Sequence, residues 1–514
     1  MAIWSLLGAL LFTLLPVWPA AAEDKALEDR VNRLEEAIKQ FKEHERREEK
    51  REGREGVIES GQPVAEPGIG VLPDVARERR SDTQPALSFG STGSGRLVYA
   101  KPFVAAPKAI VGGYMDIMYQ SRRQASIDNG FEGMTGRGIN STFDQQRFVP
   151  FIYADITEHI KFASELEIEH GIREVGGPDR EVEFGLEFAH IDYLVKEAFN
   201  LRAGILLLPV GKFNLLHDSP LNDLPDRPLV SQFIIPTTLS ETGAGFYGTL
   251  YPGRLSKIDY EFYVTTGPCG HGPDGTPGAN ELTGTRGTRQ RKCATDDGLD
   301  INNGKAFVGR LAYSPMLGIE VALSGYRGSW DAFSKRPMTI GAVDWTLQRG
   351  PFEVIGEAAW VYIQDNSKAL PGNTLDTSTT PPSQVAPGTL LTSATCPTCS
   401  GNSGAGIPPQ RMFGYYIQGN YHFMPEFLSR WSPKRFGEGS TFTGVVRWDQ
   451  VNTNQDNPGG LGDLQRLTLG LNYRPIEDTV FKFGYFFDMK ATNHPAGDVR
   501  IHDNGVMLMA ATYF

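Results

Sequence analysis

Residues 467–473 read Leu-Thr-Leu-Gly-Leu-Asn-Tyr, and residues 481–487 read Phe-Lys-Phe-Gly-Tyr-Phe-Phe. In both stretches apolar side chains alternate with polar or small ones. Because successive side chains of a β-strand point to opposite faces, each stretch predicts a strand with one apolar face. The pattern recurs in segments of about ten residues from residue 108 onward, the length of a strand that crosses a membrane.

Sixteen such segments follow one another, and turn residues bound each of them. They centre near Gly113, Phe148, Ser164, Leu186, Gly204, Tyr247, Phe262, Gly309, Leu323, Gly341, Glu357, Ile417, Val445, Leu469, Phe483 and Leu508. The number is even, as in bacterial single-chain barrels. We therefore predict an all-β fold, a 16-stranded antiparallel transmembrane β-barrel over residues 108–514.

The connections between these segments alternate in length. Short ones include 156–158, 196–199, 251–255, 314–316, 348–350 and 475–477, with 424–439 somewhat longer. The long ones are 120–144, 171–182, 210–243, 267–303, 327–337, 365–410, 451–463 and 490–503. Short periplasmic turns and long outer loops are typical of bacterial outer-membrane barrels.

Aromatic residues near segment ends predict the girdles of a barrel in outer-membrane lipid. They are Tyr153, Tyr193, Trp345, Trp360, Tyr421, Trp448 and Tyr473. The chain ends in an aromatic residue, Phe514. Such an end resembles the signal read by bacterial barrel-assembly machinery, which we expect as a partner during biogenesis.

The N-terminal region predicts export and a tether. Residues 1–22 resemble a signal peptide, although no Lys or Arg precedes the apolar run and a single membrane anchor is the alternative. Residues 23–59 predict a charged helix with heptad-spaced Leu27, Val31, Leu34 and Ile38, either a short periplasmic coiled coil or a solvated amphipathic helix. Residues 60–107, rich in Pro and Gly, predict a flexible linker.

The net charge of −11 argues against nucleic acid as a partner. The third long connection predicts an inward loop that narrows the pore. Its candidate constriction residues are Lys212, His217, Asp218, Asp223, Asp226 and Arg227. Asp226 and Arg227 could instead pair with each other and hold the loop.

A family resemblance appears over about residues 184–247. The sequence Asn-Leu-Arg-Ala-Gly at 200–204, Pro-Val-Gly at 209–211, Arg-Pro at 227–228 and Ile-Ile-Pro-Thr-Thr at 234–238 resembles the phosphate-selective porin O/P family. The resemblance implies a homotrimer with a water-filled pore in each protomer and passage of small hydrophilic solutes, with anions such as phosphate among them. It implies neither an enzyme nor a cofactor.

The charges on the predicted inner wall do not favour phosphate, because a phosphate pore needs concentrated Arg and Lys. Candidate bases are Lys161, Arg202, Lys257, Arg310, Arg447, Arg466 and Lys482. Candidate acids, which are more numerous, are Glu165, Glu167, Glu169, Glu183, Glu187, Asp259, Glu261, Glu320, Glu353, Glu357, Asp449 and Asp488. We therefore predict a hydrophilic pore without strong phosphate preference, in which these charges line the lumen or simply pair with one another.

The four cysteines predict disulfides in outer loops, Cys269 with Cys293 and Cys396 with Cys399. One zinc site shared by the two loops is the alternative. Neither His-Glu-x-x-His nor Gly-x-Ser-x-Gly occurs in the sequence. A barrel-borne enzyme and a non-conducting structural barrel remain as alternatives to a porin.

Overall fold

The computed structural model describes residues 109–123, 141–170, 183–270, 279, 284–289, 302–331, 334–364, 375–376, 383–384, 409–437, 439–456, 462–490, 493–494, 497–498 and 501–514. The predicted signal peptide, N-terminal helix and linker lie outside the described residues. So do Cys293, Cys396 and Cys399.

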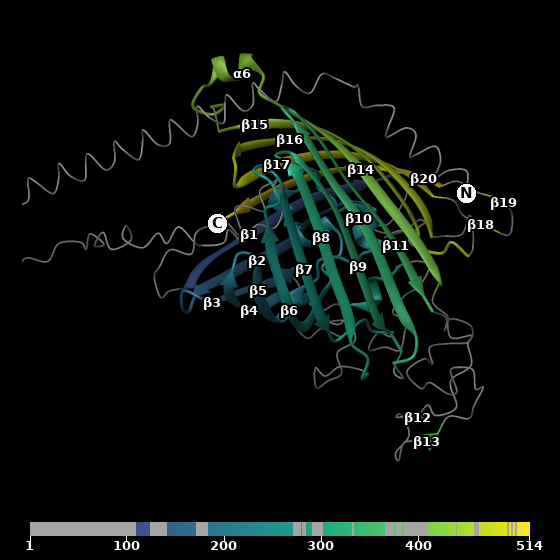
Figure 1. The fold of residues 1–514 in the computed structure, drawn as a ribbon. Helices are drawn as coiled ribbons and strands as arrows, with labels where there is room; N and C mark the ends of the chain where they lie inside the picture. The colour runs from purple at the N-terminus through teal and green to yellow at the C-terminus, as the bar shows by residue number, and fades with distance from the viewer. Residues whose placement is uncertain are drawn as a thin grey trace, which may run out of the picture. The chain divides into compact units, whose positions relative to one another are not determined.

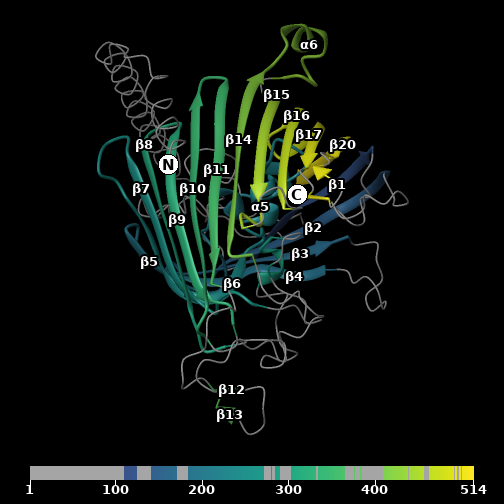
Figure 2. The same cartoon turned by 90° about the vertical axis from the view of Figure 1, so that its right-hand side faces the viewer.

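Sixteen antiparallel strands form a closed barrel, which confirms the predicted fold (Figures 1 and 2). Their bounds are β1 Ala109–Arg122, β2 Ser141–Asp155, β3 Ile160–Glu169, β4 Glu183–Lys196, β5 Phe199–Leu207, β6 Ser240–Leu250, β7 Lys257–Thr265, β8 Ala306–Met316, β9 Ile319–Ser329, β10 Pro337–Arg349, β11 Phe352–Ile363, β14 Arg411–Phe423, β15 Thr441–Asn452, β16 Asp463–Ile476, β17 Thr479–Lys490 and β20 Ile501–Tyr513. Each predicted segment centre falls within one of these strands. The first and last strands close the ring, with Tyr114 opposite Tyr513.

Two short hairpins lie in the long loops, β12 (Leu375–Asp376) with β13 (Ser383–Gln384), and β18 (Asn493–His494) with β19 (Gly497–Asp498). The barrel connections alternate in length as predicted, so one end carries the short turns and the other the long loops. We call these the short-turn end and the long-loop end. The start of β1 and the end of β20 both lie at the short-turn end.

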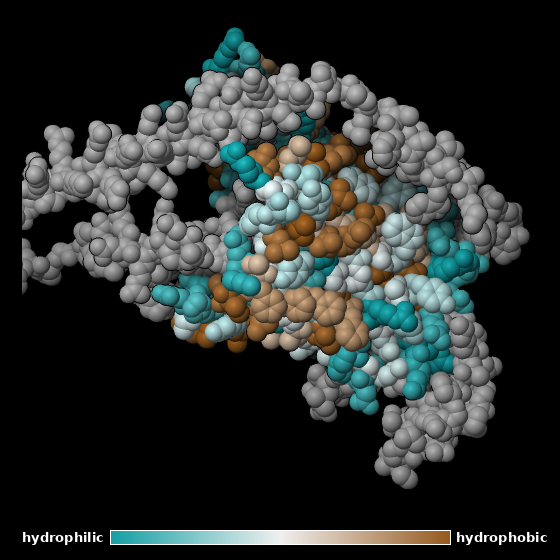
Figure 3. Space-filling view, in the orientation of Figure 1, coloured by the Kyte–Doolittle hydropathy of each residue, from teal (hydrophilic) through white to brown (hydrophobic). Residues whose placement is uncertain are grey.

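The outer face of the barrel is apolar because the side chains along each strand alternate in direction. Leu323 of β9, for example, is 62% exposed, whereas its neighbours Ala322 and Ser324 are buried. Apolar side chains cover much of the strand surface in Figure 3. Within the described ranges, no helix is both long and apolar enough to span a membrane.

Residues 208–239, which we call loop 3, fold into the barrel. They contain three short helices, α4 (Lys212–Leu215), η2 (Ser219–Leu221) and α5 (Leu229–Phe233). Helix α5 contacts β11, β14 and β15, while η2 contacts β1 and β20. Figure 2 shows α5 within the ring of strands.

The inner wall near the long-loop end is apolar, which the simple rule of apolar outside and polar inside did not predict. Val230 and Ile234 of loop 3 share a buried cluster with Ile340 of β10 and Val361 of β11. Loop 3 shields the inward side chains of β10 and β11 from water, so the inner face of these strands can be apolar there as well as the outer face. Tyr153, predicted for an outer girdle, also packs inside, in a cluster with Tyr114 and Phe151.

Candidate functional site: loop 3 and the inner wall

Asp226 of loop 3 bridges two arginines of neighbouring strands. Its carboxylate accepts hydrogen bonds from Arg447 of β15 at 2.8 Å and from Arg466 of β16 at 2.7 Å. Burial acts to raise the pKa of the Asp226 carboxyl, but the two guanidinium groups outweigh it and hold that pKa below its usual value. The predicted local pair with Arg227 is therefore not what holds this residue.

Each of these arginines is also paired with a carboxylate of the wall. Arg447 donates to Asp449 at 2.7 Å, and Arg466 donates to Asp488 at 2.5 and 2.9 Å. The backbone N–H of Leu229, the first residue of α5, donates to Asp449 at 3.0 Å. This network fastens the centre of loop 3 to β15, β16 and β17.

A second attachment joins loop 3 to a different sector of the wall. Nε2 of His217 lies 2.9 Å from Oε2 of Glu187 on β4, and both groups are buried. The next residue, Asp218, accepts a hydrogen bond from the Tyr513 hydroxyl of β20 at 2.8 Å. Ser219 donates to Asp116 of β1.

A third attachment holds the start of loop 3. Lys212 donates to Glu320 of β9 at 3.1 Å and to Thr346 of β10 at 2.7 Å. The backbone N–H of Phe213 donates to Glu357 of β11 at 3.0 Å. Asp223 accepts hydrogen bonds from Asn420 of β14 at 2.8 Å and from Asn472 of β16 at 3.0 Å. Loop 3 is thus bonded to strands all around the lumen, and the side chains of five of the six predicted constriction residues bond to the wall.

Arg227 is the sixth; its carbonyl oxygen accepts a hydrogen bond from Arg447 of the wall at 3.5 Å, but its side chain bonds to loop 3 itself. Its Nη1 donates to the carbonyl oxygen of Thr237 at 3.2 Å. Among the described residues, nothing accepts a hydrogen bond from its Nε or Nη2. Its guanidinium therefore has unused donors inside the barrel.

Most of the predicted bases of the wall are buried, and most of them pair with a carboxylate. Arg202 pairs with Asp192 at 2.7 Å, Arg310 with Asp344 at 2.7 Å, and Lys161 with Asp155 at 2.8 Å. Lys482 instead donates to the carbonyl oxygens of Ser219 and Leu224 in loop 3. These contacts agree with the interpretation in which the wall charges are paired, but three of the partner carboxylates, Asp155, Asp192 and Asp344, are not among the predicted wall residues.

On β3, Glu165 and Glu167 are buried, while Glu169 is partly exposed. Arg147 of β2 approaches Glu167 at 3.5 Å and Glu169 at 3.4 Å. Arg147 is not among the wall residues predicted from the sequence. Large apolar residues lie on both faces of β2 there, so the alternation does not show whether the Arg147 side chain points inward or outward. The side chain of Glu183 lies outside the described part.

Arg474 of β16 was also missed, although the alternation could have found it. Leu469, Leu471 and Tyr473 point outward, so residue 474 points inward. Arg474 donates to the Pro220 carbonyl oxygen at 2.7 Å and lies 3.6 Å from Asp223.

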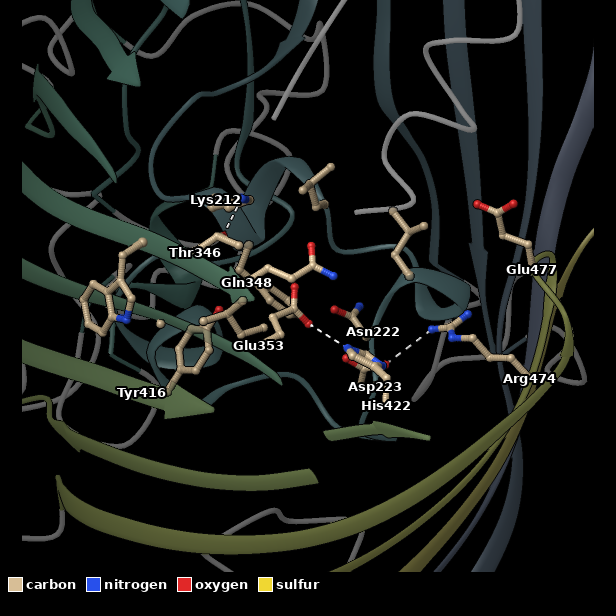
Figure 4. A pocket seen from close by; sticks show the side chains of 16 residues that line it. Lys212, Asn222, Asp223, Thr346, Gln348, Glu353, Tyr416, His422, Arg474 and Glu477 are labelled. Carbon is tan, nitrogen blue, oxygen red and sulfur yellow. Dashed lines mark hydrogen bonds and ion pairs between the residues drawn. The ribbon is translucent and has the colours of Figure 1, made fainter. Parts of the chain in front are cut away.

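A cavity of about 280 Å³ lies between loop 3 and strands β10, β11, β14 and β16 at the short-turn end (Figure 4). Its lining mixes charges of both signs with apolar side chains. Figure 4 shows contacts that cross it, between Lys212 and Thr346, between Asp223 and Arg474, and between Glu353 and His422. Such a lining suits dipolar solutes better than a single kind of ion.

Cys269 is buried and disulfide-bonded, but its predicted partner Cys293 lies outside the described residues. Within the described ranges, no three His, Cys, Asp or Glu side chains are grouped so as to hold a metal ion.

No protein-family model matches the sequence. A protein of Aquifex aeolicus (strain VF5), described as uncharacterized, is 27% identical over 398 residues, covering 76% of this chain and 81% of that protein.

Among solved structures, the outer membrane channel DcaP of Acinetobacter baumannii aligns with a TM-score of 0.43 and 11% identity, covering 79% of this chain and 97% of that one. An anion-selective porin from Comamonas acidovorans aligns with a TM-score of 0.43 and 10% identity, covering 79% of this chain and 99% of that chain. OmpF of Salmonella typhi aligns with a TM-score of 0.44 and 11% identity, covering 79% of this chain and 98% of that chain. At these TM-scores the similarities support no conclusion about this protein. The assignment of a closed barrel rests on the pairing of its own strands.

Proposed function

We propose that this protein is an outer-membrane porin, a passage for small hydrophilic solutes and ions that loop 3 narrows. One observation carries the proposal. A loop that carries five charged side chains is folded into a closed barrel of sixteen strands and bonded to polar side chains of its inner wall, while the outer face is apolar.

The membrane placement follows from the physics of the barrel wall. A closed ring pairs the backbone groups of every strand, which is what a sheet needs to span lipid. The strands have 9 to 15 residues, enough to cross the hydrocarbon core at a tilt. Exposed apolar side chains such as those of Leu311, Leu323 and Val446 are stable against lipid and costly in water.

The charges in the lumen support a passage of mixed polarity without strong phosphate preference. The arginines at positions 202, 310, 447 and 466 are each neutralised by a carboxylate. A phosphate filter requires cations that are free to bind the ion.

Two further parts of the proposal rest on the sequence. The heptad-spaced residues between 27 and 41, together with the family resemblance, support a homotrimer with its N-terminal helices in the periplasm. The C-terminal Phe514 supports insertion by the barrel-assembly machinery.

Single-channel recording in planar bilayers with ion substitution tests the function. We expect conductance with weak ion preference, in steps of three for a trimer. A strong anion preference with phosphate block at micromolar concentration would contradict the proposed selectivity.

A second candidate is a non-conducting structural barrel. The attachments of loop 3 to β4, β9, β15 and β16 favour it, because they leave the loop bonded on several sides of the lumen. Absence of conductance in the same bilayers, and no swelling of sugar-loaded vesicles, would favour this candidate over a porin.

A further inference from the structure

The turn between β14 and β15 contains an exposed helix, α6 (Glu426–Trp431), at the short-turn end (Figures 1 and 2). Phe427 and Trp431 are four residues apart and therefore share one face of this helix. They are 69% and 76% exposed. Two large rings standing in water are unfavourable, so this face requires an apolar or interfacial surrounding.

The rest of the turn is fastened to the outer side of the barrel wall. The ring of Phe436 lies 5.5 Å from that of Tyr473 and 6.3 Å from that of Phe442, between centroids. The Tyr473 hydroxyl donates to the Arg435 carbonyl oxygen at 2.7 Å. Both wall rings point outward, because their strand neighbours Thr443 and Asn472 are buried inside the barrel. The turn therefore folds over the outer rim.

Outward aromatic rings continue along the wall beside this turn. Phe442 stacks on Tyr473 at 4.6 Å and lies 6.0 Å from Phe423, which stacks on Tyr421 at 5.6 Å. These rings form a band across the short-turn ends of β14, β15 and β16. In a membrane-spanning barrel, such a band lies at the level of the lipid headgroups.

We propose that α6 is an interfacial anchor that binds the phospholipid leaflet at the short-turn end. Phe427 and Trp431 enter the boundary between headgroups and acyl chains, as aromatic side chains on the apolar face of an interfacial helix do. Lys434 and Arg435 follow in the same turn and are exposed, so they are available to pair with lipid phosphates. The inference rests on the proposed function only in that a bilayer must surround the barrel.

A protein partner is the other occupant to consider for this face. Lipid fits better, because the helix adjoins a band of rings that already faces the bilayer. A partner protein, or a second copy of this chain, becomes an outcome of the test.

The test measures the surroundings of single spin labels on the full-length protein in vesicles of phosphatidylethanolamine and phosphatidylglycerol. Trp431→Cys and Phe427→Cys each place a nitroxide on the apolar face while leaving the other ring in place. Glu426→Cys is the matched control, since residue 426 is exposed on a different face of the same helix. Wild-type protein carried through the labelling reaction checks that the native cysteines do not react.

Collision rates with oxygen, which concentrates in lipid, and with a water-soluble nickel chelate report the surroundings of each label. We expect the oxygen-to-nickel ratio at positions 427 and 431 to be several-fold higher than at 426. High nickel access at all three positions would overturn the proposal. Protection from both reagents at 427 and 431 would also overturn it, because it indicates a protein contact.

Leu323→Cys, on the outer face of β9, separates failure of this inference from failure of the proposed membrane placement. If its label contacts lipid while those at 427 and 431 contact water, only the anchor is wrong. If the label at 323 also contacts water, the placement of the barrel in the membrane is wrong.

Discussion

At the scale of single residues, Asp226 is the link whose loss should change loop 3 most. Its carboxylate joins the loop to both Arg447 and Arg466. Removing one partner of a buried charge pair costs about 3–5 kcal/mol, because the remaining charge is left unpaired. Loop 3 should therefore be held less firmly in an Asp226→Asn variant.

We expect Asp226→Asn to raise the conductance and the frequency of current fluctuations in planar bilayers. Asp456→Asn is the matched control, because Asp456 pairs with Arg411 in an exposed position at the long-loop end. Equal currents in wild type and Asp226→Asn would show that this link does not control the width of the lumen.

The same carboxylate predicts a pH dependence. Its folded-state pKa is held below the usual 3.8, so its contribution to loop attachment is complete above that value. The contribution is lost as the pH falls through the depressed pKa. The contribution of Asp226 to the wild-type conductance should thus be constant near neutral pH and change in strong acid, and Asp226→Asn should lack this part of the change. Titration of the single-channel current from pH 7 downward measures both.

Arg227 should affect ion preference more than stability. Its Nη1 bonds a carbonyl oxygen, and its buried Nε and Nη2 lack an acceptor among the described residues, so no carboxylate there is hydrogen-bonded to this guanidinium and its positive charge can attract anions in the lumen through space. Arg227→Gln should reduce the permeability of chloride relative to potassium, as measured by the reversal potential in a salt gradient. An unchanged reversal potential would place this residue off the path of the ions.

At the scale of elements, loop 3 is held by an apolar core as well as by charges. Ile234, just after α5, is fully buried in a cluster that includes Ile340 and Val361. Replacing it with Ala removes buried methyl groups and leaves a cavity, at a cost of about 2–5 kcal/mol.

Ile234→Ala should therefore lower the midpoint of thermal unfolding in detergent. Leu323→Ala is the control, because Leu323 faces outward and its truncation leaves no internal cavity. Equal midpoints for Ile234→Ala and wild type would mean that loop 3 does not stabilise the barrel.

At the scale of the whole molecule, the barrel depends on closure between its first and last strands. The backbone of Phe514 exchanges two hydrogen bonds with Gly113, and its ring stacks on Phe148 at 5.7 Å. Phe514→Ala should reduce the yield of folded barrel in the outer membrane, assessed by the mobility shift between heated and unheated samples. Phe481→Ala, an exposed ring on β17, should have a smaller effect. Equal losses would assign the effect to lipid contact rather than to closure.

The sequence by itself determined the barrel, because the direction of a strand side chain depends only on its parity along the chain. Alternation therefore located all sixteen strands, and the spacing between them separated short turns from long loops. It also located third-loop and wall residues such as Asp226, Arg447 and Arg466, whose types and positions are local features.

Only the tertiary structure decided which of these charges meet. Asp226 and Arg466 are 240 residues apart, and their contact depends on how loop 3 crosses the lumen. The apolar inner wall at Ile340 and Val361 is likewise understandable only with Ile234 packed against it. Strand parity is a local property of the backbone, whereas the path of an inward loop depends on contacts with strands distant in sequence.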